Sequence, residues 1–299
     1  MESQETPGLR FRDRLTRATF RKGLSLLMRN RAYVSNKHFP STEHSYGEHQ
    51  QQQLQIFTGN KEKTPIVFIH GGGWFFGSMQ SVAIGHGHFI QEGYPIFNIN
   101  YPLAPENPFP QGLISCFKSL MWIKKQNPEI KKVHLVGDSA GGNLAAMMGL
   151  LISNPELLAT YEKYIPNINA DDFPKITSIV SMYAVFDRPS FSEDFVSRSI
   201  FRMYAGDKCM EESVPDELRI TPLDYTWKNC PPMFLAAGKF DPLAKSSKIA
   251  ASYFQDICNN LVLKIYPRAV HGFYETPKWK DSIKMKKDIV TFFDSLSTA

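Results

Sequence analysis

The sequence predicts an α/β fold, in which a mostly parallel, twisted sheet carries helices on both faces. Two observations support this prediction. From residue 54 onward, short apolar runs of strand length alternate with longer stretches of helical periodicity. The apolar runs are also nearly continuous, which is typical of strands that are covered on both faces. The chain has 299 residues, of which 42% are hydrophobic, so a disordered, collagenous or coiled-coil protein is excluded.

Seven strands and four helices are expected in chain order. The strand candidates are 54–57, 66–69, 95–99, 133–136, 176–182, 233–236 and 261–266, and the helix candidates are 113–125, 143–153, 244–258 and 279–296. Residues 35–53 are polar and are expected to form a connector. Residues 187–227 are too long for a simple crossover, so we expect a partly helical insertion over the carboxyl edge of the sheet.

The net charge of +5 comes from the N-terminal segment. Residues 1–31 hold eight basic and three acidic side chains, and the remaining 26 bases and 26 acids cancel. A general polyanion-binding surface, and hence a nucleic-acid partner, is not supported.

The N-terminal arginines recur at helical spacing, at positions 10, 14, 17 and 21. We expect a helix that docks on the body through Phe11 and Leu15 and ends near Gly23. A lid over an active site and a membrane-surface or targeting segment are the alternatives.

The sequence carries no sign of export or of a metal site. No apolar run approaches the roughly 18 to 20 residues of a membrane-spanning helix, and residues 1–8 lack the pattern of a signal peptide. Four cysteines lack any CxxC spacing, so neither zinc nor a disulfide framework is indicated: Cys116, Cys209, Cys230 and Cys258. We expect reduced thiols, a cytoplasmic protein without stable membrane insertion, no metal and no cofactor.

A glycine-flanked serine follows the strand candidate 133–136. The run Gly137-Asp138-Ser139-Ala140-Gly141-Gly142 leads into a helical pattern. A GxSxG match alone is weak, because roughly one unrelated chain in ten contains it by chance. The strand–turn–helix context is that of a nucleophile elbow, in which small neighbours expose a serine hydroxyl. A plain glycine turn or a phosphate loop is the alternative, although the lysine of a P-loop is missing.

A second glycine loop, His70-Gly71-Gly72-Gly73-Trp74, follows the strand candidate 66–69. Glycines let backbone amides approach the oxygen of a tetrahedral intermediate. We expect an oxyanion hole made by the amides of Gly72, Gly73 and Ala140, with His70 in a structural hydrogen bond. A flexible turn without a catalytic part is the alternative.

A serine hydroxyl needs a base, and the base needs an acid that holds its tautomer. His271 and Asp241 each follow a late strand candidate, at the edge where Ser139 lies. The order Ser139, Asp241, His271 is that of an α/β-hydrolase triad. Asp187, also at a strand end, is the rival acid.

These motifs together resemble the hormone-sensitive-lipase-like family of α/β-hydrolases, the HGGG esterases. The resemblance covers residue 54 to the C-terminus and rests on HGGGW, YPLAPE at 101–106, GDSAGGNLA at 137–145, TPL at 221–223, DPL at 241–243 and HGF at 271–273. The chain departs from the family pattern at two places. Pro102 stands where the family usually has an arginine, and Ala244-Lys245 stands after DPL where the family often has Arg-Asp. The resemblance implies an α/β-hydrolase fold with a small helical cap, built from residues 1–50 and the insertion at 187–227, on a domain spanning 51–299.

The resemblance implies a serine esterase that forms an acyl-enzyme. An amidase such as an arylformamidase would use the same triad, and a non-catalytic small-molecule-binding homologue is the rival outside enzymes. The partner expected is therefore a small acyl ester or amide, and a homodimer stays open. Bulky side chains predict a narrow pocket that prefers short acyl groups: Trp74, Phe75, Phe76, Met79, Phe186, Phe191, Phe195, Phe201 and Tyr204. Their alternative role is to seal the cap to the body.

Overall fold

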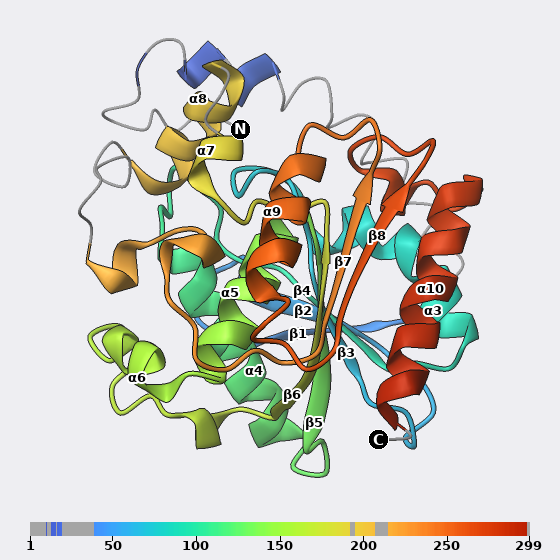
Figure 1. Cartoon of the computed structure of the whole chain (residues 1–299). Helices are drawn as coiled ribbons and strands as arrows, with labels where there is room; N and C mark the ends of the chain where they lie inside the picture. Colours follow the sequence, from blue (N-terminus) through green and yellow to red (C-terminus); the bar gives the residue numbers. More distant parts are fainter. Residues whose placement is uncertain are drawn as a thin grey trace.

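The computed structural model describes residues 10, 13–15, 17–19, 39–191, 195–206 and 215–297. Within these ranges eight strands form one sheet in the order β1-β2-β4-β3-β5-β6-β7-β8 (Figure 1). The strands are β1 (Thr42–Ser45), β2 (Gln53–Phe57), β3 (Ile66–Ile69), β4 (Ile96–Ile99), β5 (Lys132–Asp138), β6 (Lys175–Met182), β7 (Met233–Gly238) and β8 (Leu261–Tyr266). β2 pairs antiparallel with β1 and β4, and all the other pairs are parallel. The α/β fold class is thus confirmed.

Helices cover both faces of the sheet, as Figure 1 shows. One face carries α4 (Gln111–Gln126), α5 (Ala140–Ile152) and α9 (Ala244–Phe254), and the other carries α2 (Met79–Val82), η1 (Ala83–His86), α3 (Gly87–Gln91) and α10 (Lys280–Ser297). Each face has its own apolar core. β3 is buried along its whole length, which explains why its sequence is continuously apolar. Because strands β3 to β8 run parallel to one another, their carboxyl ends lie at one edge of the sheet.

The polar segment expected as a connector contains the edge strand β1. All four residues of β1 are exposed, and they pair with β2 in the register Thr42↔Ile56 to Ser45↔Gln53. An edge strand with both faces in solvent has no apolar period, so no pattern in the sequence indicates it. The proposed division at residue 50 stays a prediction.

The insertion is partly helical and lies above the carboxyl ends of the strands (Figure 1). It contains α7 (Arg188–Phe191), α8 (Phe195–Ala205) and the short turns η5 (Asp216–Leu218) and η6 (Pro222–Asp224). Further short helices, α6 (Pro155–Leu158), η2 (Ala159–Tyr161) and η3 (Ala170–Asp172), precede β6, and η7 (Phe273–Glu275) precedes α10. A small helical cap is therefore present.

The N-terminal helical residues dock through charged groups rather than through Leu15. Leu15 is 58% exposed, whereas Asp13 is 2% exposed and meets α8. Arg202 Nη2 donates to Asp13 Oδ1 at 2.8 Å, and Ser199 donates to the same oxygen. Arg17 pairs with Glu106 on the body. The expectation of apolar docking through Leu15 is wrong, and Phe11 and Gly23 lie outside the described residues.

The cysteine prediction also needs correction. Cys230 and Cys258 form a disulfide that joins the segment before β7 to the segment after α9. The two residues are 28 positions apart, and no local spacing motif announces such a pair. Cys116 is a buried free thiol, and Cys209 lies outside the described residues. Among the described helices, none combines the length and apolar character that crossing a bilayer needs.

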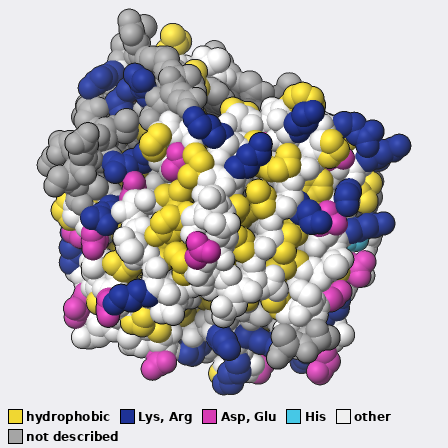
Figure 2. All heavy atoms as spheres, viewed as in Figure 1, with side chains coloured by type: hydrophobic (Ala, Val, Ile, Leu, Met, Phe, Trp, Pro, Cys, Tyr) yellow, Lys and Arg dark blue, Asp and Glu magenta, His cyan; other side chains and the backbone are white. Residues whose placement is uncertain are grey.

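Charges are unevenly spread over the neutral body. Figure 2 shows Lys and Arg side chains gathered above the ends of β7 and β8, whereas both signs mix on the lower part of the same face. Lys239, Lys248 and Arg268 are exposed next to these strand ends. The surface around the ends of β7 and β8 is therefore locally basic.

Candidate active site

Ser139 lies in a strained turn between β5 and α5. Its backbone has φ 52° and ψ −119°, a conformation that L-residues rarely adopt. The neighbouring glycines make room for it: a Cβ on Gly137 would lie 2.2 Å from the Gly141 carbonyl oxygen, and one on Gly141 would lie 2.0 Å from the Ile69 oxygen. The Ser139 amide donates to Met182 O at 2.8 Å, which fixes the turn to β6. The small residues of the motif therefore hold the serine side chain at the carboxyl edge.

The three side chains predicted as a triad meet at this edge. Ser139 Oγ is 2.9 Å from His271 Nε2, and His271 Nδ1 is 3.0 Å from Asp241 Oδ2. Asp241 follows β7 and its side chain is fully buried, while the imidazole of His271, which follows β8, is 38% exposed. A carboxylate at Nδ1 holds the proton there and leaves Nε2 free to accept the serine proton. This arrangement can activate Ser139 as a nucleophile.

The rival acid Asp187 is engaged elsewhere. Asp187 Oδ2 accepts the amide of Ser190 at 2.8 Å and so caps α7, while its other oxygen accepts the hydroxyl of Ser246. Leu243 donates its amide to Asp241 Oδ1 at 2.8 Å, which orients that carboxylate towards His271. Of the two acids, Asp241 is the one in contact with the imidazole.

The glycine loop after β3 forms a tight turn. Gly72 and Gly73 have φ of 116° and 59°, and a Cβ on Gly72 would lie 2.0 Å from Phe76 O. The amides of Phe75 and Phe76 both point to Gly72 O. Within the described residues, the amides of Gly72, Gly73 and Ala140 have no hydrogen-bond acceptor. Unused donors of this kind are what an oxyanion hole requires.

Two residues that the sequence analysis did not assign to the site support the glycine loop. Asp138, which is buried, accepts the Gly71 amide at 2.8 Å through Oδ1, so the residue before Ser139 is tied to the loop. Tyr101 donates its hydroxyl to His70 O at 2.9 Å and stacks on the His70 ring. Burial lowers the pKa of His70 to about 4, and Nδ1 of this neutral ring donates to Gly71 O. An acid directly before the nucleophile was the available signal for Asp138.

The side chains predicted to line the substrate pocket are mostly packed against one another. Trp74 stacks on Tyr204 with ring centroids 4.3 Å apart, and Phe201 contacts the same indole. Six of the set are buried to 2% exposure or less: Trp74, Phe75, Met79, Phe186, Phe201 and Tyr204. Phe76 and Phe191 are half-buried. The contact of Trp74 with Phe201 and Tyr204 joins the cap to the body. A role of these side chains in acyl recognition stays a prediction. The side chain of Phe195 lies outside the described set.

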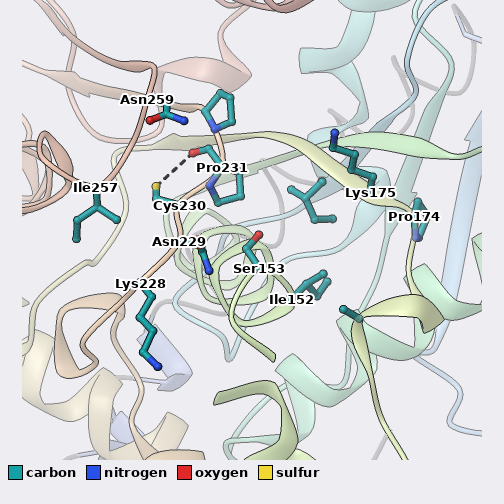
Figure 3. Close-up of a pocket in the computed structure, with 13 residues that line it drawn as sticks. Ile152, Ser153, Pro174, Lys175, Lys228, Asn229, Cys230, Pro231, Ile257 and Asn259 are labelled. Atoms are coloured by element: carbon teal, nitrogen blue, oxygen red, sulfur yellow. Dashed lines mark hydrogen bonds between the residues drawn. The ribbon is translucent and has the colours of Figure 1, made fainter. Parts of the chain in front are cut away.

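A hollow of about 580 Å³ lies at the opposite edge of the sheet. Its lining comes from the end of α5, the starts of β6 and β7 and the segment after α9, and it includes Cys230 of the disulfide (Figure 3). Lys175 and Lys228 border it. It is separated from Ser139 by the length of the strands. In the described ranges, no group of three His, Cys, Asp or Glu side chains is arranged to hold a metal.

Comparison with known proteins identifies the family. Residues 66–275 match a family model described as alpha/beta hydrolase fold. The chain belongs to the α/β-hydrolase fold family. The match spans the glycine loop, the serine turn and the histidine loop of this α/β-hydrolase, and it confirms the fold expected from the motifs.

Curated relatives of this α/β-hydrolase include esterases and lipases. Carboxylesterase NlhH of Mycobacterium tuberculosis is 25% identical over 216 residues, which cover 70% of this chain and 66% of that protein. Hormone-sensitive lipase of Mus musculus is 39% identical over 95 residues, covering 30% of this chain and 12% of the lipase. The chain thus spans just under two thirds of the first relative and a small part of the second. The resemblance to the hormone-sensitive-lipase-like family is confirmed.

Solved structures show the same fold over nearly the whole chain. Esterase B from Lactobacillus rhamnosis superposes with a TM-score of 0.77 at 20% identity and covers 96% of both chains. An esterase from Pyrobaculum calidifontis superposes with a TM-score of 0.71 at 19% identity, covering 99% of this chain and 95% of that one. At this identity the likeness concerns the fold.

Proposed function

We propose that this α/β-hydrolase cleaves short-chain carboxylic esters through an acyl-enzyme. The observation that carries the proposal is the unbroken hydrogen-bonded series Ser139–His271–Asp241, with distances of 2.9 and 3.0 Å, on a strained serine turn. The carboxylesterase relative supports ester hydrolysis rather than another reaction of this fold.

The proposed reaction has two half-reactions. Ser139 Oγ attacks the acyl carbon while His271 Nε2 takes its proton, and the amides of Gly72, Gly73 and Ala140 stabilise the oxyanion. His271 then returns the proton to the departing alcohol. In the second half, water attacks the acyl-enzyme, gives its proton to His271, and the acid leaves as Ser139 is reprotonated. Asp241 holds the imidazole tautomer throughout.

We propose a preference for acyl groups of about two to six carbons. Trp74 contacts Phe201 and stacks on Tyr204, and in this proposal these buried rings bound the acyl pocket. Each buried methylene gains about 0.8 kcal/mol until the pocket is full, after which further carbons clash. The esterase B neighbour was solved with a C4-C4 tributyrin phosphonate inhibitor, which fits the same range.

The decisive experiment combines one variant with a substrate panel. Ser139→Ala should abolish turnover of p-nitrophenyl acetate and butyrate while the circular dichroism spectrum stays that of the wild type. Wild-type-like turnover in this variant would refute the assignment. If activity rises steadily to dodecanoyl and palmitoyl esters and increases at an oil interface, the protein is a lipase and the assignment as a short-chain esterase is wrong.

The amidase alternative shares the triad and needs its own assay. The aromatic residues after the glycine loop and the LAPE run at 103–106 favour an ester substrate. Comparing kcat/KM for N-formylkynurenine with that for short acyl esters separates the two reactions. Failure of the pure protein to react with a fluorophosphonate would favour a non-catalytic small-molecule-binding protein.

Thiol state tests the proposed cytoplasmic location. Disulfides are uncommon in the reducing cytoplasm, so the Cys230–Cys258 disulfide of the structure weighs against this location, and the state of the two thiols in cells decides between them. Trapping of Cys230 and Cys258 as free thiols in intact cells would support that location, and finding them oxidised would contradict it. The proposed partner is the small acyl substrate, and size-exclusion chromatography with light scattering decides whether the chain forms a homodimer.

A further inference from the structure

The loop that carries His271 is tied to helix α10 at both ends. Three residues before His271, the amide of Arg268 donates to Asp281 Oδ2 at 2.8 Å. Three residues after His271, the carbonyl of Tyr274 accepts Ser282 Oγ at 3.1 Å and Lys286 Nζ at 2.9 Å. The backbone on either side of the imidazole is therefore fixed to one helix.

The three tethering side chains of α10 are all buried. Ser282 and Lys286 are four residues apart and so lie on the same side of the helix, whereas Asp281 lies in its first turn. Asp281, Ser282 and Lys286 are 3%, 0% and 3% exposed. Polar groups at a helix face that packs on a sheet are costly unless each has a partner. Here every one of the three meets the backbone of the histidine loop.

Tyr274 is fixed through its ring as well as its carbonyl. Its hydroxyl is 2.8 Å from His86 Nδ1, and its ring stacks on Phe68 at a centroid distance of 5.1 Å. A Cβ on Gly85 would lie 2.2 Å from this ring, so the close fit depends on that glycine. The segment η1–α3 lies beside α10 on the same side of the sheet (Figure 1). Between Tyr274 and His271 the loop turns at Gly272, which has φ 77°.

Lys286 is an unusual choice for a core position. Its ammonium lies 4.6 Å from the centre of the Tyr274 ring, and the other titratable groups around it are His86 and His88. Burial lowers the pKa of Lys286 to about 7, far below its ordinary value. A methionine would fill similar space without the cost of burying an amine. A side chain that is unfavourable for folding and bonded to the histidine loop points to a role in that loop.

We infer that α10 positions the general base: Asp281, Ser282 and Lys286 hold the backbone on both sides of His271, so that its Nε2 stays in reach of Ser139. This inference rests on the proposed esterase function. The three are positioning residues, since none of them contacts Ser139 or the imidazole through a hydrogen bond. A shift of about 1 Å in a catalytic group can cost about 100-fold in rate, so tethers on both sides have a large effect.

The test compares Lys286→Met, Ser282→Ala and the double variant with the wild type. Active sites are first counted by titration with a fluorophosphonate, so that kcat refers to folded, reactive enzyme. We expect kcat per titrated site on p-nitrophenyl butyrate to fall about tenfold in Lys286→Met and further in the double variant, with KM within about twofold. Lys287→Met, an exposed position next along the helix, is the matched control and should leave both constants unchanged.

A second measurement separates positioning from simple stability. Amides of residues 268–274 should exchange with solvent faster in the double variant, while the free energy of unfolding at pH 6 does not fall in Lys286→Met. Unchanged kcat per site together with unchanged amide exchange in the double variant would overturn the inference. If the fluorophosphonate does not titrate the wild-type protein, the proposed function is overturned instead. The exchange measurement would then still show whether Ser282 and Lys286 hold the backbone around His271.

Discussion

Asp138 shows how a single buried carboxylate can organise two loops at once. It belongs to the turn that presents Ser139, and it accepts the Gly71 amide of the neighbouring glycine loop. Gly71 could not carry a side chain here, because a Cβ would lie 2.6 Å from Asp138 Oδ2. The serine turn and the glycine loop are therefore linked to each other by this hydrogen bond.

A matched pair of substitutions tests this role. Asp138→Asn keeps an acceptor for the Gly71 amide, so we expect kcat to change less than about threefold. Asp138→Ala leaves that buried amide without its acceptor, which costs about 1 to 3 kcal/mol, and kcat should fall about tenfold or more. Steady-state kinetics on p-nitrophenyl butyrate measure both. Equal rates for the two variants would show that Asp138 does not control the glycine loop.

Lys286 predicts a characteristic pH dependence of stability. Its pKa of about 7 in the folded state lies below the ordinary lysine value of 10.5, so the unfolded chain binds the extra proton between these two pH values. Stability contributed by this group must therefore rise with pH across that window and stay low below pH 7. The whole effect is at most about 5 kcal/mol, from about 1.36 kcal/mol per pKa unit over about 3.5 units.

Urea unfolding of Lys286→Met at pH 6 and pH 9 measures the effect. The difference in unfolding free energy between the wild type and Lys286→Met should move in favour of the wild type as pH rises, while Lys287→Met should follow the wild type at both values. A constant difference would mean that Lys286 keeps an ordinary pKa in the folded protein.

At residue scale, a role could be predicted where the place of a residue at the end of a strand determines which other residues it can meet. Ser139, Asp241 and His271 each follow a strand, and parallel strands end at one edge, so their meeting could be anticipated. Lys286 lies within a helical pattern, where nothing in the sequence tells which backbone carbonyl it reaches. The acceptor role of Asp138 depends on a loop 67 residues away, which no local sequence pattern indicates.

At the scale of elements, burial decided what could be predicted. All seven expected strands are present because each carries a short apolar run, whereas the exposed and polar β1 was missed. The helices α2 and α3 were missed because they are only four and five residues long, and because glycines lie between them at position 85 and at the start of α3 at position 87. The docking of the N-terminal residues was mispredicted because a buried ion pair replaced the expected apolar contact.

The contact between Asp13 and α8 makes a prediction for the cap. Burial alone would raise the pKa of Asp13, but hydrogen bonds from Arg202 and Ser199 lower it below its ordinary value. Arg202→Met removes the cation that is hydrogen-bonded to this buried carboxylate, and breaking such pairs costs about 3 to 5 kcal/mol. Hydrogen exchange at residues 13–19 should therefore accelerate in Arg202→Met. The double variant with Asp13→Asn should recover part of the loss, and purely additive effects would contradict the pairing.

At the scale of the whole molecule, the two edges of the sheet are used differently. The triad and the glycine loop lie at the carboxyl edge, under the cap. The disulfide and the 580 Å³ hollow lie at the amino edge, beyond the full length of β7. Asp241 follows the far end of that strand. Constraints at the amino edge can therefore stabilise the chain without touching the chemistry.

Removing the disulfide should separate stability from activity. A cross-link 28 residues apart restricts the unfolded chain, and the chain-entropy relation gives about 3 to 4 kcal/mol for a loop of this length. Cys230→Ser/Cys258→Ser should lower the unfolding free energy by about that amount. The kcat on p-nitrophenyl butyrate should stay within about twofold at 25 °C, because the end of β7 that leads to Asp241 is held by its neighbours β6 and β8. Urea unfolding with and without a reductant measures the first part, and the wild type under reductant should match the variant. A large fall in kcat at full folding would show instead that the amino edge controls the position of Asp241.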